Sequence, residues 1–439
     1  MKLTFKSFIK PITTCVALTL IAAGCGGGGT KGAAVELVVW KVFEDNSHFQ
    51  PLLQAYKKTH PNVRVTFVEK NATGYKEELI NALASGQGPD IFSINNAWLP
   101  EYIDKVAPTT EQQWTFNDYK NTFVDAVVND FTRDRKIYGA ATYVDSLALY
   151  YNKDLLGSAG IATPPRTWDE LARDVQNLTR QNQTGYFSRS GIAAGLSSAA
   201  PSGQVNRAED ILYLFMLQQG AQAWSADGTR PLFNGTVTNS QGQQIYPARE
   251  ALGFYTSFAN STSPYYAWNT RSDYSIDAFA NTRAAMMISY SYARDLVTQK
   301  ASTLNFDVAP VPQPNLDQPE VNFANYWGEV VSKQSKHQKE SWDFLKAITG
   351  KDALDKYYAG HKLPSSRKDL IELQTSDPDI GVFAHANLTA KTFYRPDQLK
   401  FDAIMAKAID DVVLRGVSVD QAVSEAASQG GALAVPRRN

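Results

Sequence analysis

The chain has 439 residues, of which 43% are hydrophobic and 20% charged, and its formal net charge is −1. This composition is typical of a folded globular protein of two or three domains and excludes an intrinsically disordered chain. The near-zero net charge, without any run of five like charges, argues against a nucleic-acid-binding surface or a polybasic membrane patch.

The N-terminus has the pattern of a secretion signal. Three lysines precede the apolar run at residues 12–23, which is too short to cross a bilayer as a helix. The run ends in IAAGC, residues 21–25, which resembles the bacterial lipobox, where cleavage before the cysteine leaves a lipidated thiol. We therefore expect a signal peptide at 1–24, a lipid on Cys25 and a flexible tether over 25–34. Ordinary cleavage without a lipid is the alternative.

Cleavage before Cys25 would change the charge and the thiol content of the protein. Residues 1–24 contain three lysines and no acidic residue, so the formal charge would move from −1 to −4. Cys15 would be lost, and the single remaining thiol could not form an internal disulfide. The mature protein is therefore expected to be mildly acidic, tethered outside the cytoplasm and stable without cross-links.

The first hundred residues alternate between strand and helix patterns. Strand-like runs occur at 36–40, 63–68 and 91–94. The first intervening segment places Phe49, Leu52, Leu53 and Tyr56 at the spacing of one helical face, and the second, at 75–85, repeats this pattern. This order predicts βαβ units and a parallel sheet, in which the loops at the carboxyl ends of the strands carry the ligand crevice.

Polar and aromatic residues follow two of these strands. Glu44 and Asp45 come after the first strand, and Asn95, Asn96 and Trp98 come after the third, so we expect all five on one rim. Other interpretations stay open. The acids could favour a helix N-terminus, the asparagines could form a turn, and Trp98 could belong to the core.

Further strands and helices are predicted after residue 136. Strand-like alternation resumes within 137–156, after a break at Gly139, and TPPRTWDEL predicts a helix whose start is a capping box of Thr167 and Glu170. The proline-punctuated segment at 306–314 is expected to be extended and to cross between lobes.

Six segments in this order resemble the extracellular solute-binding proteins, family 1, of ATP-driven importers. They are YKEELINALASGQGPDIF, YGAATYVDSLALYYNKDLLGSAGIATPPRTWDEL, AAMMISYSYA, FDVAPVPQP, YWGEVVSKQSKHQKESWDFLKAIT and VVLRGVSVDQAV. The resemblance covers nearly all of residues 35–430. It implies an α/β periplasmic-binding-protein fold of type II, with a ligand cleft between two lobes joined by hinge strands.

The resemblance also implies where the lobes begin and end. The N-terminal lobe would comprise 35–139 and 312–351, and the C-terminal lobe 140–311 and 352–439. The chain departs from the family at Thr282 and Arg283, where a glycine followed by Lys or Glu is usual, and at Tyr292, where Trp is usual. The sugar preference of a relative cannot be carried across these changes.

A neutral sugar needs carboxylates and amides for its hydroxyls and flat aromatic faces for its ring. The resemblance implies ligand contacts at Tyr143 and Asp145, and it aligns Tyr326 and Trp327 with a segment that faces the cleft. The other interpretations are an Asp145 that caps a surface turn and a buried strand start at Tyr326.

Residues 254–292 are unusually aromatic, with ten aromatic residues in 39 positions. The aromatic residues with helical spacing are expected to pack in the core. Trp268 and Tyr290 are candidates for the cleft, and Tyr292 matches the stacking aromatic of the family.

The sequence thus predicts a lipid-anchored, monomeric receptor of an ABC importer, which binds a mono- or oligosaccharide by hinge closure and delivers it to a membrane permease. We expect no cofactor, metal or nucleic acid: the five histidines are scattered, and no P-loop or nucleophile-elbow motif is present. The alternatives are the same fold with a polyamine, a polyol phosphate or iron, and a surface glycosidase with two carboxylates. A phosphate would require clustered basic residues, which the predicted rim lacks.

Overall fold

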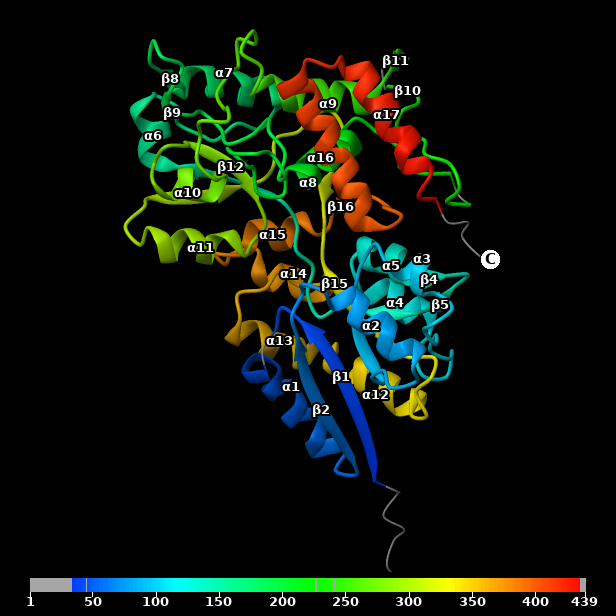
Figure 1. The fold of residues 1–439 in the computed structure, drawn as a ribbon. Coiled ribbons are helices and arrows are strands. Elements are labelled where there is room, and N and C mark those ends of the chain that lie inside the picture. The colour runs from blue at the N-terminus through cyan, green and yellow to red at the C-terminus, as the bar shows by residue number, and fades with distance from the viewer. Residues whose placement is uncertain (1–33, 45, 226, 240–241, 435–439) are drawn as a thin grey trace, which may run out of the picture.

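The computed structural model describes residues 34–434, apart from 45, 226 and 240–241. The predicted signal peptide, the lipidation site Cys25 and the candidate ligand residue Asp45 therefore lie outside the described residues. Figure 1 shows two lobes, one around the strands β1 and β2 and the other around β12, with several chain segments between them.

The first lobe is built on a five-stranded sheet in the order β2-β1-β3-β15-β6. Its strands are β1 (Val35–Val42), β2 (Val63–Lys70), β3 (Ile91–Asn95), β6 (Gly139–Ala140) and β15 (Trp327–Val331). Both β2 and β3 pair with β1 in parallel, as the alternation of strands and helices predicted, whereas β15 runs antiparallel between β3 and β6. A small hairpin, β4 (Thr132–Arg133) with β5 (Lys136–Ile137), completes the strands of this lobe.

Helices cover this sheet because one face of each is apolar. Phe49, Leu52 and Tyr56, three of the residues predicted on one face of the first helix, are buried in the core of the lobe. The helices are α1 (Asn46–Thr59), α2 (Tyr75–Ala84), α3 (Leu99–Tyr102), α4 (Phe116–Thr122), α5 (Asp125–Phe131), α12 (Gln338–Ile348), α13 (Lys351–Gly360) and α14 (Lys368–Gln374).

The second lobe has a three-stranded antiparallel sheet in the order β12-β7-β13, with its own apolar core. Its strands are β7 (Ala148–Asn152), β12 (Met286–Ser289) and β13 (Phe306–Ala309), with the small pairs β8 (Arg180–Gln181) and β9 (Phe187–Arg189), and β10 (Val237–Thr238) and β11 (Gln244–Ile245). Its helices are α6 (Lys153–Ser158), α7 (Trp168–Leu178), α8 (Ala208–Gln218), α9 (Pro247–Ser257), α10 (Ser275–Ala280), α11 (Ala293–Lys300), α16 (Gln398–Arg415) and α17 (Val419–Gly431). The predicted capping box is present at α7, where Thr167 and Glu170 each accept a hydrogen bond from the backbone of the other. None of the helices in the described part of the chain combines the length and apolar character needed to cross a membrane.

Three segments connect the lobes, and they lie side by side. The backbone of the first, at 141–147, bonds to the second through Asn325 N–H to Asp145 O at 3.1 Å and Leu147 N–H to Phe323 O at 3.1 Å. The second segment contains β14 (Asn322–Phe323), which pairs in parallel with β16 (Ala390–Lys391) of the third segment. Helix α15 (Gly381–Ala386) lies at this junction, with Phe383 in the core of the second lobe and Ala384 in that of the first.

The packing differs from the expected lobe boundaries at 312 and 352. Residues 312–321 stay on the second lobe, where Gln218 Nε2 donates to the carbonyl oxygens of Pro312 at 3.0 Å and Val321 at 3.2 Å. Helices α13 and α14 pack into the first lobe, because their apolar faces join the core that contains α1. The chain therefore enters the first lobe near β15 and leaves it only after α14.

Candidate ligand-binding site

A cavity of about 790 Å³ lies between the lobes, within the usual size range of small-molecule sites. Its walls come from the end of β1, all three connecting segments, the start of β15, and the β12–α11 junction. The six predicted site residues that line it are Tyr143, Asp145, Tyr290, Tyr292, Tyr326 and Trp327. The structure thus brings together, around one space, residues that are up to 184 positions apart in the sequence.

Aromatic rings face the cavity from both lobes. On the first lobe, the ring of Trp327 lies 5.5 Å from that of Phe43 and 4.9 Å from that of Trp98, in both cases edge to face. On the second lobe, Tyr292 stacks on Tyr290 with 6.1 Å between ring centroids, and Tyr292 is 42% exposed. The cavity is therefore lined by aromatic side chains of both lobes.

Asp145 lies in the first connecting segment and bonds to the second lobe. Its carboxylate accepts hydrogen bonds from Ser291 N–H at 3.0 Å and from Ser291 Oγ at 2.9 Å. Burial raises the pKa of Asp145 to about 7, because these bonds only partly compensate for the loss of water. This carboxyl group therefore holds a proton more readily than an ordinary aspartate, and it borders the cavity.

Three basic side chains also line the cavity, which corrects the expectation that the rim lacks them. Arg207, Arg294 and Lys362 reach it from positions far apart in the chain. Each is paired with an acid: Arg207 with Asp210 at 2.5 Å, and both Arg294 and Lys362 with Asp379, at 2.6 and 3.6 Å. The basic groups are therefore largely neutralised by the protein itself.

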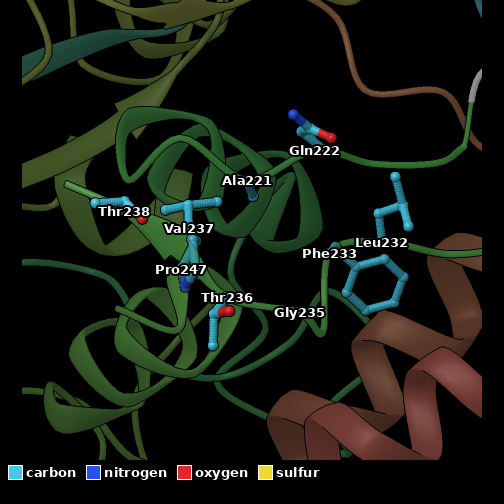
Figure 2. A pocket seen from close by; sticks show the side chains of 9 residues that line it. All are labelled: Ala221, Gln222, Leu232, Phe233, Gly235, Thr236, Val237, Thr238 and Pro247. Atoms are coloured by element: carbon cyan, nitrogen blue, oxygen red, sulfur yellow. The ribbon is translucent and has the colours of Figure 1, made fainter. Parts of the chain in front are cut away.

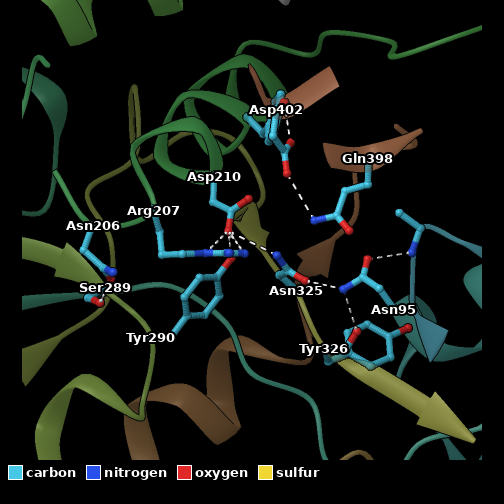
Figure 3. A network of polar contacts seen from close by, with 12 residues as sticks. Asn95, Asn206, Arg207, Asp210, Ser289, Tyr290, Asn325, Tyr326, Gln398 and Asp402 are labelled. Atoms are coloured by element: carbon cyan, nitrogen blue, oxygen red, sulfur yellow. Dashed lines mark hydrogen bonds and ion pairs between the residues drawn. The ribbon is translucent and has the colours of Figure 1, made fainter. Parts of the chain in front are cut away.

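Asp210 joins the cavity to the second connecting segment (Figure 3). Its Oδ2 accepts hydrogen bonds from Arg207 Nε at 2.7 Å, Tyr290 OH at 2.8 Å and Asn325 Nδ2 at 3.2 Å. Burial opposes ionisation of Asp210, but the guanidinium groups of Arg207 and Arg395 hold its pKa below the usual value. Asp210 is therefore a permanent anion behind the cavity wall.

Asn95 and Asn96, predicted as ligand contacts, are instead buried at the end of β3, beside the second connecting segment. Asn95 Nδ2 donates to Asn325 Oδ1 at 2.8 Å, which extends the Asp210 network into the first lobe (Figure 3). Asn96 Nδ2 donates to Asp130 Oδ2 at 3.0 Å, and Tyr326 OH donates to the same oxygen at 2.8 Å. Burial raises the pKa of Asp130. Both asparagines are buried, and neither lines the cavity.

Three further candidates do not line the cavity. Glu44 is buried in the first lobe, where Lys41 Nζ lies 2.9 Å away and Tyr357 OH donates to it at 2.7 Å. Trp98 lies behind Trp327 and donates to Gln398 Oε1 at 2.9 Å. Trp268 is fully buried in the second lobe, and its indole N–H donates to Gly203 O at 2.7 Å.

Several lining residues were missed by the sequence analysis. Phe43 directly precedes the predicted pair at 44–45, but it was not considered as a candidate. Asn325 directly precedes the predicted Tyr326 in the same way. No local signal could have identified Arg207, Arg294 or Lys362, because their positions depend on how the lobes pack.

Another pocket, in the second lobe, lacks the charged side chains of the cavity between the lobes. Figure 2 shows a pocket of about 360 Å³ in the second lobe, between the 221–222 loop and the β10–β11 region, lined mainly by small and aliphatic residues and without a charged side chain. In the described part of the chain, no group of three or more His, Cys, Asp or Glu is placed to hold a metal ion.

Two α/β lobes that enclose an aromatic and polar cavity beside three connecting segments define a two-lobed ligand-binding protein. The chain belongs to the bacterial extracellular solute-binding protein family, whose model matches residues 40–354.

Known proteins support this assignment. The chain is 21% identical to the maltotriose-binding protein of Pyrococcus abyssi over 404 residues, which cover 89% of this chain and 79% of that protein. It is 22% identical to the diacetylchitobiose-binding protein of Streptomyces coelicolor over 350 residues, covering 77% and 76%. The crystal structure of the cyclic α-maltosyl-1,6-maltose-binding protein of Arthrobacter globiformis superposes with a TM-score of 0.74 at 19% identity, covering 91% of this chain and 99% of that one. These relatives are named as binding proteins, and the fold is the two-lobed fold of the sugar-binding structures.

Proposed function

We propose that this protein binds a mono- or oligosaccharide in the cavity between its lobes. The observation that carries the proposal is that one cavity is lined by aromatic residues of both lobes, among them Trp327 and Tyr292, together with polar groups such as Asp145. Aromatic faces suit the C–H faces of a sugar ring, and carboxylates and amides suit its hydroxyl groups. The names of the relatives, which include maltotriose and diacetylchitobiose binders, favour the same class of ligand.

The proposed cellular role is that of an extracytoplasmic receptor of an ABC importer. Lipidation of Cys25 would anchor the mature chain to the membrane, and the loaded protein would deliver its sugar to the transmembrane permease subunits. The protein would act as a monomer without a cofactor and would release the sugar chemically unchanged.

The proposed mechanism is closure of the lobes around the sugar. A ligand that contacts both Trp327 and Tyr292 gains more binding free energy when the lobes are close, so it shifts the population toward the closed form. The three side-by-side connecting segments would act as the hinge, since they carry the chain between two otherwise separate cores. A permease could then distinguish loaded from empty protein by shape.

The cavity is less suited to the other solutes. A phosphate group would compete with Asp210 and Asp379, which already pair with the cavity's basic side chains. Ferric iron prefers phenolate ligands, but burial raises the pKa of Tyr290 well above its usual range and that of Tyr292 to about 12. A polyamine would need several free carboxylates, whereas Asp379 is paired with Arg294 and Lys362 and Asp145 accepts two hydrogen bonds from Ser291, which leaves Asp295 among the acids that line the cavity.

A surface glycosidase would require two carboxyl groups on either side of the scissile bond. Asp145 is the one cavity-lining carboxylate that is buried, and both of its oxygens accept hydrogen bonds from Ser291. These hydrogen bonds fix the Asp145 carboxylate in place, which suits an acceptor for sugar hydroxyl groups better than a nucleophile.

The test is a ligand screen by thermal shift and calorimetry with maltotriose, mannobiose, tagatose, spermidine, glycerol 3-phosphate and ferric citrate. A ligand at 100 times its dissociation constant should stabilise the protein by about 2.7 kcal/mol. We expect a sugar to stabilise it and to be recovered intact. Stabilisation by a non-sugar alone, or the appearance of new reducing ends, would contradict the proposal.

A further inference from the structure

Phe43 combines two unfavourable features at the end of β1. Its backbone φ is +66°, a left-handed conformation that bulky residues rarely adopt and that costs of order 1–3 kcal/mol. Its side chain is 63% exposed, although its ring is large and apolar. A glycine would relieve the strain and a polar residue would suit the solvent, so folding alone does not explain a phenylalanine here.

The location of the ring suggests its purpose. Phe43 lines the cavity between the lobes and meets Trp327 edge to face, with 5.5 Å between ring centroids and 67° between ring planes. Trp327 is supported from behind by Trp98 at 4.9 Å and by Tyr75 at 6.0 Å. The rings of Phe43 and Trp327 thus meet at an angle. Trp327 is held by its packing against Trp98 and Tyr75, whereas the ring of Phe43 is exposed to the cavity.

We propose that Phe43 is a ligand-stacking residue that selects for sugars with an apolar ring face. This inference rests on the proposed function and adds a residue to it. The left-handed backbone turns the ring into the cavity, where it takes one C–H face of a pyranose while Trp327 takes the edge of the same ring. Binding covers the exposed aromatic surface, which offsets the strain that the empty protein carries.

The experiment compares three substitutions at Phe43 with one control. Phe43→Gly removes the ring and relieves the backbone, Phe43→Ala removes the ring and keeps the strain, and Phe43→Trp keeps a flat ring. Thr282→Gly is the matched control, because Thr282 is also exposed, also left-handed at φ +60°, and does not line the cavity. Melting temperatures of the empty proteins and calorimetric affinities for maltotriose, mannobiose and tagatose are measured.

We expect Phe43→Gly to melt no lower than Phe43→Ala and to bind the preferred sugar at least about tenfold more weakly than the wild type. Phe43→Trp and Thr282→Gly should bind within about twofold of the wild type. Unchanged affinity of Phe43→Gly would overturn the inference and leave sugar binding intact. A Phe43→Gly protein that melts below Phe43→Ala would also overturn it, because the backbone at residue 43 would then carry no strain that calls for a functional explanation. A wild type that is stabilised by a non-sugar alone would refute the inference together with the function on which it rests.

Discussion

The carboxylate of Asp145 accepts two hydrogen bonds from Ser291, one from its backbone N–H and one from its hydroxyl. Asp145 belongs to the first connecting segment and Ser291 to the junction between β12 and α11, so this pair fixes the connection against the second lobe. The same carboxylate borders the cavity. Its protonation state therefore affects both the stability of the protein and the charge of the cavity wall.

The first prediction concerns pH. The ordinary pKa of this aspartate is 3.8, and in the folded protein it is about 7. Between these values the folded chain binds more protons than the unfolded chain, so this group lowers the free energy of unfolding as pH rises, by up to about 1.4 kcal/mol per pH unit. Asp145→Asn should remove this slope when urea denaturation is followed from pH 4.5 to 7.5. Parallel curves for the two proteins would contradict the assignment.

The second prediction concerns the aromatic wall of the second lobe. Tyr292→Ala should weaken binding of the preferred sugar at least about tenfold, because a stacking face is lost, while the melting temperature of the empty protein changes little. Trp268→Ala is the contrasting variant. Trp268 is fully buried, so its loss should cost about 3–5 kcal/mol of folding free energy. Equal losses of stability in both variants would show that Tyr292 is structural.

The third prediction concerns the buried anion at Asp210. Asp210→Asn should lower the free energy of unfolding by about 3–5 kcal/mol, because it leaves Arg207 and the fully buried Arg395 without this charge. Asp402→Asn removes the other partner of Arg395, but Asp402 is partly exposed, so its effect should be smaller. Urea denaturation of both variants measures the difference. The reverse order would show that Asp402 is the dominant partner.

The fourth prediction concerns the hinge. Asn325 donates to Asp210 and accepts from Asn95, so it links a helix of the second lobe to a strand end of the first. Asn325→Ala should cost about 1–3 kcal/mol and should broaden the range of lobe orientations in the empty protein. Small-angle X-ray scattering with and without sugar checks this. An unchanged radius of gyration in the empty variant would mean that the backbone bonds of the connecting segments suffice.

Local patterns predicted the elements well. The parallel pairing of β1 with β2 and β3 follows from strands that alternate with helices, and the capping box at Thr167 follows from local chemistry. The resemblance to the family supplied the two lobes. The lobe boundaries differed because α13 and α14 are amphipathic helices that could cover either core, and only tertiary packing decides between them.

The candidate site was harder to predict than the fold. The loop after β3 was expected to bind a ligand because it holds two amides and a tryptophan. The amides instead bond to Asn325 and Asp130, which are partly buried polar groups beside the connecting segments. Asn side chains serve this structural use as well as they serve ligand binding. The left-handed backbone of Phe43 and the pairing of Arg294 with Asp379 have no local signature. Partners far apart in the chain are fixed only when the lobes assemble.

The position of β15 bears on how the chain is made. This strand fills the gap between β3 and β6 in the first sheet, yet it ends at residue 331 of 439. During synthesis, the edges of β3 and β6 that pair with β15 stay unpaired while the ribosome adds most of the second lobe. Unpaired strand edges promote aggregation. A chaperone that shields the nascent first lobe, or a translocation step that threads the chain before it collapses, would meet this requirement.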